Sequence, residues 1–232
     1  MKKLVAIIII LIIIFIGMLI YKNINTKSNY ISMQEIDKIE TYITKIYMWK
    51  EITNEAIPEF ENINEADDLW VWEVIKKNIE EYEMSYEEIT QKGKELFGTN
   101  FSKELPIEGS KYLVYDEESK LYHAIGMGLD EQEDSFFLNK IERTKSGYEV
   151  EIVEYLEDYS GVLRKEQNSE EYDIIIMNTS GKEIGRRKNT MQENTIEIIK
   201  ENIEEFTKKK IILESEDGKI YVQSVRNMKR YL

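Results

Sequence analysis

Cysteine is absent from this 232-residue sequence, and histidine occurs once, as His123. Without cysteine the chain has no disulfide framework, no thiolate nucleophile and no site for lipid attachment at an N-terminal cysteine. Zinc and copper prefer nitrogen and sulfur ligands, so a single histidine nearly excludes sites for those metals. His123 lies in a predicted strand whose sequence neighbours offer no catalytic or metal-binding partner. We therefore predict an ordinary, half-buried histidine.

Positive charge is also scarce, with 31 lysines and arginines against 45 aspartates and glutamates. Four of the basic residues and none of the acidic ones precede Ser28. The segment from Ser28 to Leu232 therefore has 27 basic and 45 acidic residues, a net charge of −18. A domain this acidic repels phosphate backbones and anionic lipid surfaces. We expect no nucleic acid among its partners.

The motifs of several enzyme classes are missing. No Gly-x-Ser-x-Gly elbow, P-loop or dinucleotide-binding glycine pattern occurs. The pair Gly126-Met-Gly128 lacks the third glycine of a dinucleotide fingerprint and is more typical of a bulge or of another backbone in close approach. Among 45 carboxylates, no pair stands out as a catalytic acid and base.

One acidic run, Asp130-Glu-Gln-Glu-Asp134, could present alternate oxygens to calcium from Asp130, Gln132 and Asp134. However, an EF-hand loop needs glycine where Ser135 stands, a bidentate glutamate where Ile141 stands, and flanking helices. We interpret the run as a solvated hairpin tip. The sequence thus assigns no catalytic, cofactor-binding or metal-ligating residue, and no cofactor.

The chain does contain one long apolar run, from Leu4 to Ile20. Its seventeen residues form a helix of about 25 Å, slightly short of a bilayer core of ~30 Å. Interfacial Tyr21 and snorkelling Lys3 and Lys22 close that gap. A cleaved signal peptide is the alternative, but its apolar part usually has about 7–15 residues before a small-residue cleavage site. No such site follows, so we predict an uncleaved transmembrane anchor that contacts the bilayer through residues 4–20.

The orientation of this anchor is less strongly determined. Two lysines precede the span, and Lys22 and Lys27 follow it, so the charge count is a tie. The free amino terminus and the short basic tail, as in export signals, favour an inside amino terminus. We expect residues 1–27 to form a cytoplasmic tail, anchor and tether. Residues 28–232 would then be the extracytoplasmic domain of a single-pass cell-membrane protein.

Helical periodicity dominates the start of that domain. A capping box of Ser32 and Glu35 opens one predicted helix, and a box of Ser85 and Glu88 opens another that Gly98 closes. The first helix has an apolar stripe of Ile36, Ile39, Ile43 and Ile46. This spacing also fits a coiled-coil seam, but two heptads are too few, so we predict a core helix.

A third helix is predicted between these two, over Asp67–Glu83, with acidic residues in its first turn that suit the helix dipole. Trp70 and Trp72 are two positions apart on it and therefore point in different directions. We expect Trp72 to anchor the core and Trp70 to be partly exposed.

The period then changes to two, which predicts strands. A polar connection is expected over Glu157–Glu171, and a final helix over Glu193–Lys208 with Lys208–Lys210 at its carboxyl end. Asp217-Gly218 predicts a tight last hairpin. The predicted strands are Lys111–Tyr115, Lys120–Ile125, Ser135–Arg143, Tyr148–Leu156, Tyr172–Asn178, Ile211–Glu214 and Lys219–Val225.

This order of elements predicts an α+β fold, with helices packed on a mainly antiparallel sheet. Residues 28–232 can form one domain. A division near residues 157–171 is the alternative.

Three features resemble uncharacterised, membrane-tethered extracytoplasmic proteins of low-GC Gram-positive bacteria. They are the Lys-Lys anchor, the helix end Lys94-Glu-Leu-Phe-Gly98 before a tyrosine-rich strand, and the final segment Ile212–Val225. The resemblance implies a cystatin-like or NTF2-like ectodomain, in which helices pack on a curved antiparallel sheet. It transfers no catalytic residue.

These observations favour a non-enzymatic envelope protein whose domain binds a protein or small-molecule partner. A structural subunit of a membrane machine, such as a conjugation or secretion complex, is the alternative, and a carboxylate-based hydrolase is a third. Two facing carboxylates in a deep pocket would favour the enzyme. A flat apolar patch, or symmetric pairing through Ile36–Ile46, would favour the machine.

Overall fold

The computed structural model describes residues 30–125, 132–160, 173–188 and 194–228. Its class is α+β, with helices and antiparallel sheets, as predicted. The predicted anchor, residues 4–20, lies outside the described residues. Within the described part, no helix is both long enough and apolar enough to cross a membrane.

Helix α2 (Met33–Ile46) begins as predicted, because Ser32 and Glu35 form the capping box. Its stripe is buried inside the same chain: Ile39, Ile43 and Ile46 are fully inaccessible to solvent. A stripe that already packs in its own core cannot also be the seam of a coiled coil, so symmetric pairing through it is ruled out.

Helix α4 (Asp68–Lys77) begins at its cap Asp67 but ends earlier than the predicted Asp67–Glu83. The expectation that Trp70 is partly exposed was wrong, since Trp70 and Trp72 are 0% and 1% exposed. Trp70 packs against aromatic rings on two sides, and its Nε1 donates to two backbone carbonyls. Both faces of α4 are therefore covered, by α2 and α3 (Lys50–Thr53) on one side and by later elements on the other.

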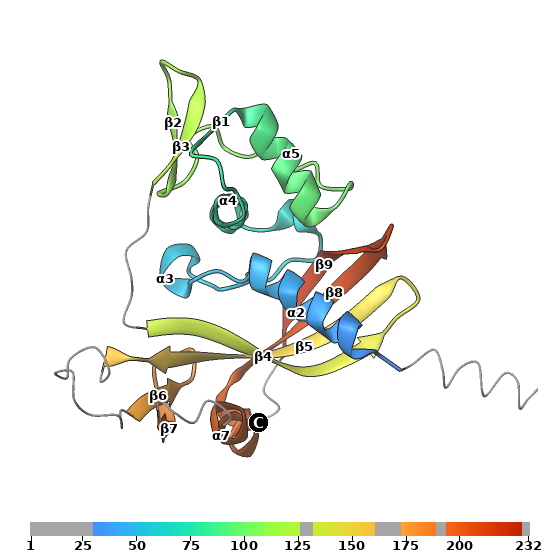
Figure 1. Cartoon of the computed structure of the whole chain (residues 1–232), viewed down its shortest axis with the longest axis vertical. Helices are drawn as coiled ribbons and strands as arrows, with labels where there is room; N and C mark the ends of the chain where they lie inside the picture. The colour runs from blue at the N-terminus through green and yellow to red at the C-terminus, as the bar shows by residue number, and fades with distance from the viewer. Residues whose placement is uncertain (1–29, 126–131, 161–172, 189–193, 229–232) are drawn as a thin grey trace, which may run out of the picture.

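Helix α5 (Tyr86–Phe97) follows the second predicted capping box, Ser85 with Glu88. It ends at Gly98, whose φ of 96° suits glycine. Beside it lies a small antiparallel sheet in the order β1-β3-β2, at the upper left of Figure 1. Its strands are β1 (Glu83–Met84), β2 (Leu113–Asp116) and β3 (Leu121–Ala124). The β2–β3 hairpin was predicted, whereas β1 was not: it begins at Glu83, the last residue of the range predicted as helix.

The large sheet has six strands in the order β7-β6-β5-β8-β9, with β4 paired to β5. One edge of β5 carries β4 along its length. The other edge carries β8 first and then β6. Strand β7 was not predicted, because it is short, polar and at a sheet edge. The strands are β4 (Gln132–Arg143), β5 (Gly147–Asp158), β6 (Asp173–Met177), β7 (Glu183–Lys188), β8 (Thr207–Glu216) and β9 (Lys219–Asn227).

The predicted helix over Glu193–Lys208 is partly wrong. Helix α7 (Asn194–Glu201) is followed by a single 3-10 turn, η2 (Ile203–Glu205), and strand β8 starts at Thr207. Lys208–Lys210 is therefore in a strand, where it pairs with β5, and not at a helix end. Backbone pairing with β5 outweighs the helical spacing of the apolar residues in this segment.

Helices α2 and α3 lie on one face of the large sheet, and α7 lies on the other (Figure 1). Strand β5 contributes to both cores. Tyr148, Val150 and Ile152 belong to the main core, and Val153 belongs to a second core with residues of β6 and α7. On the opposite face of β5, Glu149 and Glu151 are partly exposed. Beyond Glu151, the second core covers that face.

The second core also contains a buried ion pair. Arg187 of β7 binds Glu157 of β5 with Nη2–Oε distances of 3.1 Å to both carboxylate oxygens. Thr195 Oγ1 donates to the same carboxylate at 2.9 Å, and the Tyr159 hydroxyl donates to it as well. Glu157, predicted to start a polar connection, is thus part of the core. Most of that connection, residues 161–172, lies outside the described residues.

Candidate functional site

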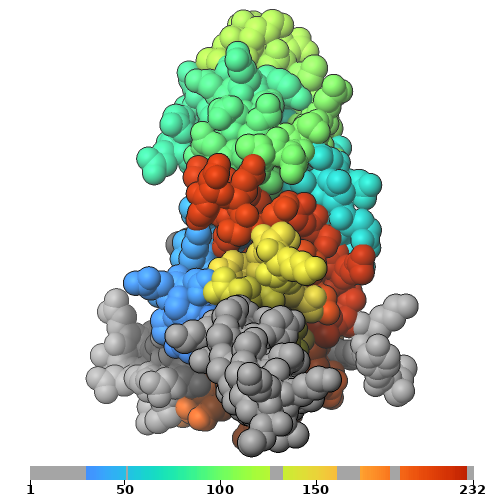
Figure 2. All heavy atoms as spheres, turned by 90° about the vertical axis from the view of Figure 1, so that its right-hand side faces the viewer, coloured from blue at the N-terminus to red at the C-terminus, as the bar shows by residue number. Residues whose placement is uncertain are grey.

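A groove of about 600 Å³ lies between α2, α5 and the start of β9. Figure 2 shows the tip of the β8–β9 hairpin, in red, between the green of α5 and the blue of α2. The groove combines a partly apolar floor with charged walls. Its lining residues are Asp37, Lys38, Thr41, Tyr42, Lys45, Asn78, Lys92, Glu95, Leu96, Lys219, Ile220 and Tyr221.

The hydroxyl of Tyr42 connects the three elements that form the groove. It donates to the carbonyl oxygen of Leu96 on α5 at 3.1 Å and accepts from the amide of Val222 on β9 at 2.8 Å. Burial raises the pKa of Tyr42 well above its ordinary value, so the hydroxyl stays protonated and can donate. Because both bonds are buried, they hold the spacing of the two helices and the strand.

Tyr221 forms another part of the floor, and Gly98 allows its position. A Cβ at Gly98 would come within 3.0 Å of the Tyr221 ring. The glycine at the end of α5 therefore serves two purposes: its φ of 96° turns the chain, and its missing side chain leaves room for the ring.

The walls of the groove are positively charged on balance. Lys38, Lys45, Lys92 and Lys219 face only Asp37 and Glu95. Lys92 pairs with Glu95 at 3.8 Å, and Lys38 Nζ donates to the carbonyl of Gly218. Within the described part of the chain, Lys45 of α2 and Lys219 of β9 form no ion pair. These two ammonium groups stand on different walls of the groove.

A second, more polar pocket of about 360 Å³ lies where β6 and β8 meet along β5. Lys209 is 2% exposed; its Nζ donates to Glu55 at 2.9 Å and to the carbonyl of Ile57, and lies 3.7 Å from Glu154 Oε1. Lys50 closes the pocket from α3, where its Nζ donates to the carbonyl of Thr179 at 2.7 Å.

Glu154 is the buried acid of this pocket. It is 4% exposed, and its Oε1 has no hydrogen-bond partner among the described residues. Burial raises the pKa of Glu154 from 4.5 to about 7, against the opposing attraction of Lys209. A carboxyl group with this pKa exchanges its proton near neutral pH.

Neither Glu154 nor Lys209 was singled out from the sequence, although a signal exists. The alternation Tyr148, Val150, Ile152 puts position 154 on the buried face of β5. In the same way, Ile211 and Leu213 put position 209 on the buried face of β8. A charged residue that continues the buried face of a strand marks a polar cluster in the core.

The structure gives His123 partners that its sequence neighbours did not suggest. Glu83 Oε1 lies 3.4 Å from Nδ1, and on the other side of the ring Asp116 Oδ2 lies 3.6 Å from Nε2. Ser119 Oγ is 3.4 Å from Nε2, so Ser119, His123 and Glu83 follow one another as in a serine–histidine–acid triad. These distances exceed the reach of about 2.6–3.2 Å that nucleophile activation needs, and Asp116 competes for the same nitrogen. The side chain is 27% exposed, as expected for a half-buried histidine.

The acidic run considered for calcium is only partly described, because Asp130 and Glu131 lie outside the described residues. The pair Gly126-Met-Gly128 also lies outside them. Asp134 accepts a hydrogen bond from the backbone amide of Lys50 at 2.6 Å, at the start of α3. Among the residues that the structure describes, no three His, Asp or Glu side chains are grouped so that they could hold a metal ion.

Comparison with known proteins does not assign this chain to a family. No protein-family model, curated protein or solved structure matches the chain. The resemblance to membrane-tethered extracytoplasmic proteins remains a prediction from the sequence, and the site is assigned from its own residues.

Proposed function

We propose that this chain is a non-enzymatic, membrane-anchored envelope protein that binds a ligand or partner in the groove between α2 and α5. Residues 4–20 would hold it in the bilayer, and residues 28–232 would form the extracytoplasmic binding domain. The observation that carries the proposal is the groove itself. Its volume of about 600 Å³ is within the range of about 300–1,000 Å³ that is usual for small-ligand sites.

The second pocket supports a hydrolase less well. Its carboxylates Glu55 and Glu154 flank the ammonium of Lys209, and Asp134 is engaged by the start of α3. A carboxylate pair for hydrolysis needs an acid and a base that face a shared substrate, about 5–9.5 Å apart. Here the acids converge on a lysine, which is the arrangement of a structural cluster.

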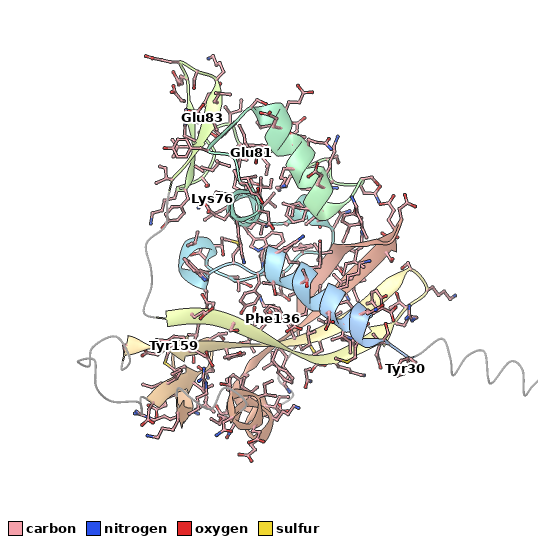
Figure 3. The ribbon with its side chains drawn as sticks, in the orientation of Figure 1. Tyr30, Lys76, Glu81, Glu83, Phe136 and Tyr159 are labelled. Atoms are coloured by element: carbon pink, nitrogen blue, oxygen red, sulfur yellow. The ribbon has the colours of Figure 1, made fainter. Side chains whose placement is uncertain are left out.

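The alternative, a structural subunit of a membrane machine, is favoured by exposed apolar residues of the small sheet. Four large apolar side chains are exposed on and beside the small sheet, at 40–69%: Tyr82, Ile107, Val114 and Ile125. Figure 3 shows Glu83 of this sheet far from Tyr30, the first described residue. A surface remote from the anchor side of the domain is suited to contact another envelope protein.

The absence of cysteine gives a direct test of topology. A Lys145→Cys variant places one thiol in the exposed β4–β5 turn, and a Lys2→Cys variant places one ahead of the apolar run. A membrane-impermeant maleimide applied to intact cells should label the first variant and not the second. The reverse pattern would show the domain to be cytoplasmic, and release of the protein by an alkaline wash would show that no anchor exists.

The groove itself is tested by filling it. Thr41 is exposed on the α2 wall, so Thr41→Trp should occupy the space and abolish binding of groove ligands without changing the core. Crosslinking of full-length protein in native membranes should capture a partner in the wild type and lose it in this variant. Capture that is unchanged in Thr41→Trp and lost when Val114 and Ile125 become serine would favour the machine subunit instead.

A further inference from the structure

We infer that the ligand of the groove between α2 and α5 is a small organic anion, with a carboxylate or phosphate group on an apolar or aromatic body. This inference rests on the proposed function and specifies its ligand. It follows from three properties of the groove: its unpaired lysines, its apolar floor and the charge of the surrounding domain.

Two lysines of the groove lie beside carboxylates without pairing with them. Acidic residues outnumber basic ones by 45 to 31, so a surface lysine has ample carboxylates nearby. Outside the groove, Lys103, Lys140 and Lys210 pair with carboxylates at 2.6–2.8 Å, whereas exposed Lys94 and Lys145 form no ion pair among the described residues. Lys45 and Lys219 form no ion pair within the described residues, although Asp37 and Glu95 line the same groove. Their ammonium groups are available to an anionic ligand.

The floor selects for more than charge. Tyr42, Leu96, Ile220 and Tyr221 are 4–8% exposed and form an apolar surface with two aromatic rings. A fully hydrated inorganic anion would gain nothing from this floor. An anion with an aromatic or aliphatic body would bury that body on the floor while its charged group reaches the lysines.

The charge of the rest of the domain limits the size of the anion. The groove has four lysines against two acids, whereas residues 28–232 carry a net charge of −18. Coulomb interactions at physiological ionic strength decay over about 8 Å, so the local positive charge attracts an anion only when it is close. A long polyanion would extend beyond the groove onto acidic surface and be repelled. The groove therefore favours a compact anion.

Fluorescein is a suitable probe, because it is a compact aromatic dianion at pH 7.5. Rhodamine 123 has nearly the same ring system but is a cation. Full-length protein in nanodiscs of zwitterionic lipid should bind fluorescein saturably, as measured by fluorescence anisotropy against empty nanodiscs. Rhodamine 123 should bind at least tenfold more weakly, and Thr41→Trp should abolish the binding of fluorescein.

Substitution of the two unpaired lysines tests the mechanism. Lys45→Gln with Lys219→Gln should raise the Kd for fluorescein about tenfold, since each lost ion pair weakens binding several-fold. The matched control is Lys94→Gln with Lys145→Gln, which removes the same charge from exposed lysines outside the groove. It should change the Kd less than twofold, and near-UV circular dichroism should show all variants folded.

Three results would overturn the inference. If both dyes bind equally and Thr41→Trp blocks both, the groove binds ligands without selecting anions, and only the proposed function survives. If the binding of fluorescein does not depend on Thr41, the groove is not its site and the inference fails, whereas the proposed function is then decided by the crosslinking of the Thr41→Trp variant. If sedimentation shows a wild-type dimer that Lys45→Glu with Lys219→Glu dissociates, the occupant is a second copy of the chain.

Discussion

Replacing Glu154 by glutamine should make the domain more stable, and only at neutral and alkaline pH. Burial without a full set of hydrogen-bond partners raises the folded-state pKa of Glu154 from 4.5 to about 7. In the unfolded chain this group releases its proton near pH 4.5. As pH rises from 4.5 to 7, the folded state thus retains a proton that the unfolded state has lost. Stability therefore falls across this window.

The size of the effect follows from the same shift. One pKa unit corresponds to about 1.4 kcal/mol, so the charged form of Glu154 costs the folded state about 3 kcal/mol above pH 7. Glutamine has the same shape and does not titrate. Lys209 keeps Glu55 at 2.9 Å and the carbonyl of Ile57 as partners, so the substitution does not leave a buried ammonium alone.

Urea unfolding of residues 28–232, followed by the fluorescence of buried Trp70 and Trp72, measures this effect. The free energy of unfolding of Glu154→Gln minus that of the wild type should rise by about 3 kcal/mol from pH 4.5 to pH 8. The control Glu117→Gln, in the exposed β2–β3 turn, should give a flat difference. A flat difference for Glu154→Gln as well would refute the reasoning, because it would mean that the folded protein holds Glu154 charged at no cost.

Three further changes test the packing around the groove and the second core by the same urea assay. Tyr42→Phe should lower the free energy of unfolding by about 1–3 kcal/mol, because the buried Val222 amide loses its acceptor; no loss would mean that the hydroxyl does not hold the groove. Arg187→Met should cost about 3–5 kcal/mol by leaving Glu157 charged and buried, and adding Glu157→Leu should restore most of it. Gly98→Ala should cost about 1–3 kcal/mol, because alanine is strained at a φ of 96° and its Cβ would press on Tyr221.

Much of the secondary structure could be predicted because its signals are local. The two capping boxes, at Ser32 and Ser85, place side chain and backbone partners three residues apart, and both form as expected. The last hairpin turns at Asp217-Gly218, both with positive φ, because this pair tolerates that backbone conformation. The period-two alternation of apolar residues was sufficient to predict β5, where every second residue from Tyr148 to Ile152 is buried.

The wrong predictions concern segments whose structure depends on residues that are far away in the sequence. Trp70 was expected to be partly exposed, but α4 is covered on both faces by elements that the sequence does not place beside it. The apolar residues of segment 202–210 have helical spacing. Nevertheless β8 forms there, because its backbone pairs with the edge of β5. Strand β7 was missed because an edge strand with few apolar residues has little periodicity to reveal it.

The sequence by itself determined the α+β class, the acidity of the domain and the apolar segment 4–20 that predicts the anchor. Each depends on composition or on neighbouring residues. Only the tertiary structure decided the groove, because Lys45 and Lys219 are 174 positions apart in the sequence and line different walls of it. It also decided that Glu154 shares a buried pocket with Lys209, since the pKa of a carboxyl group depends on the atoms that fold around it.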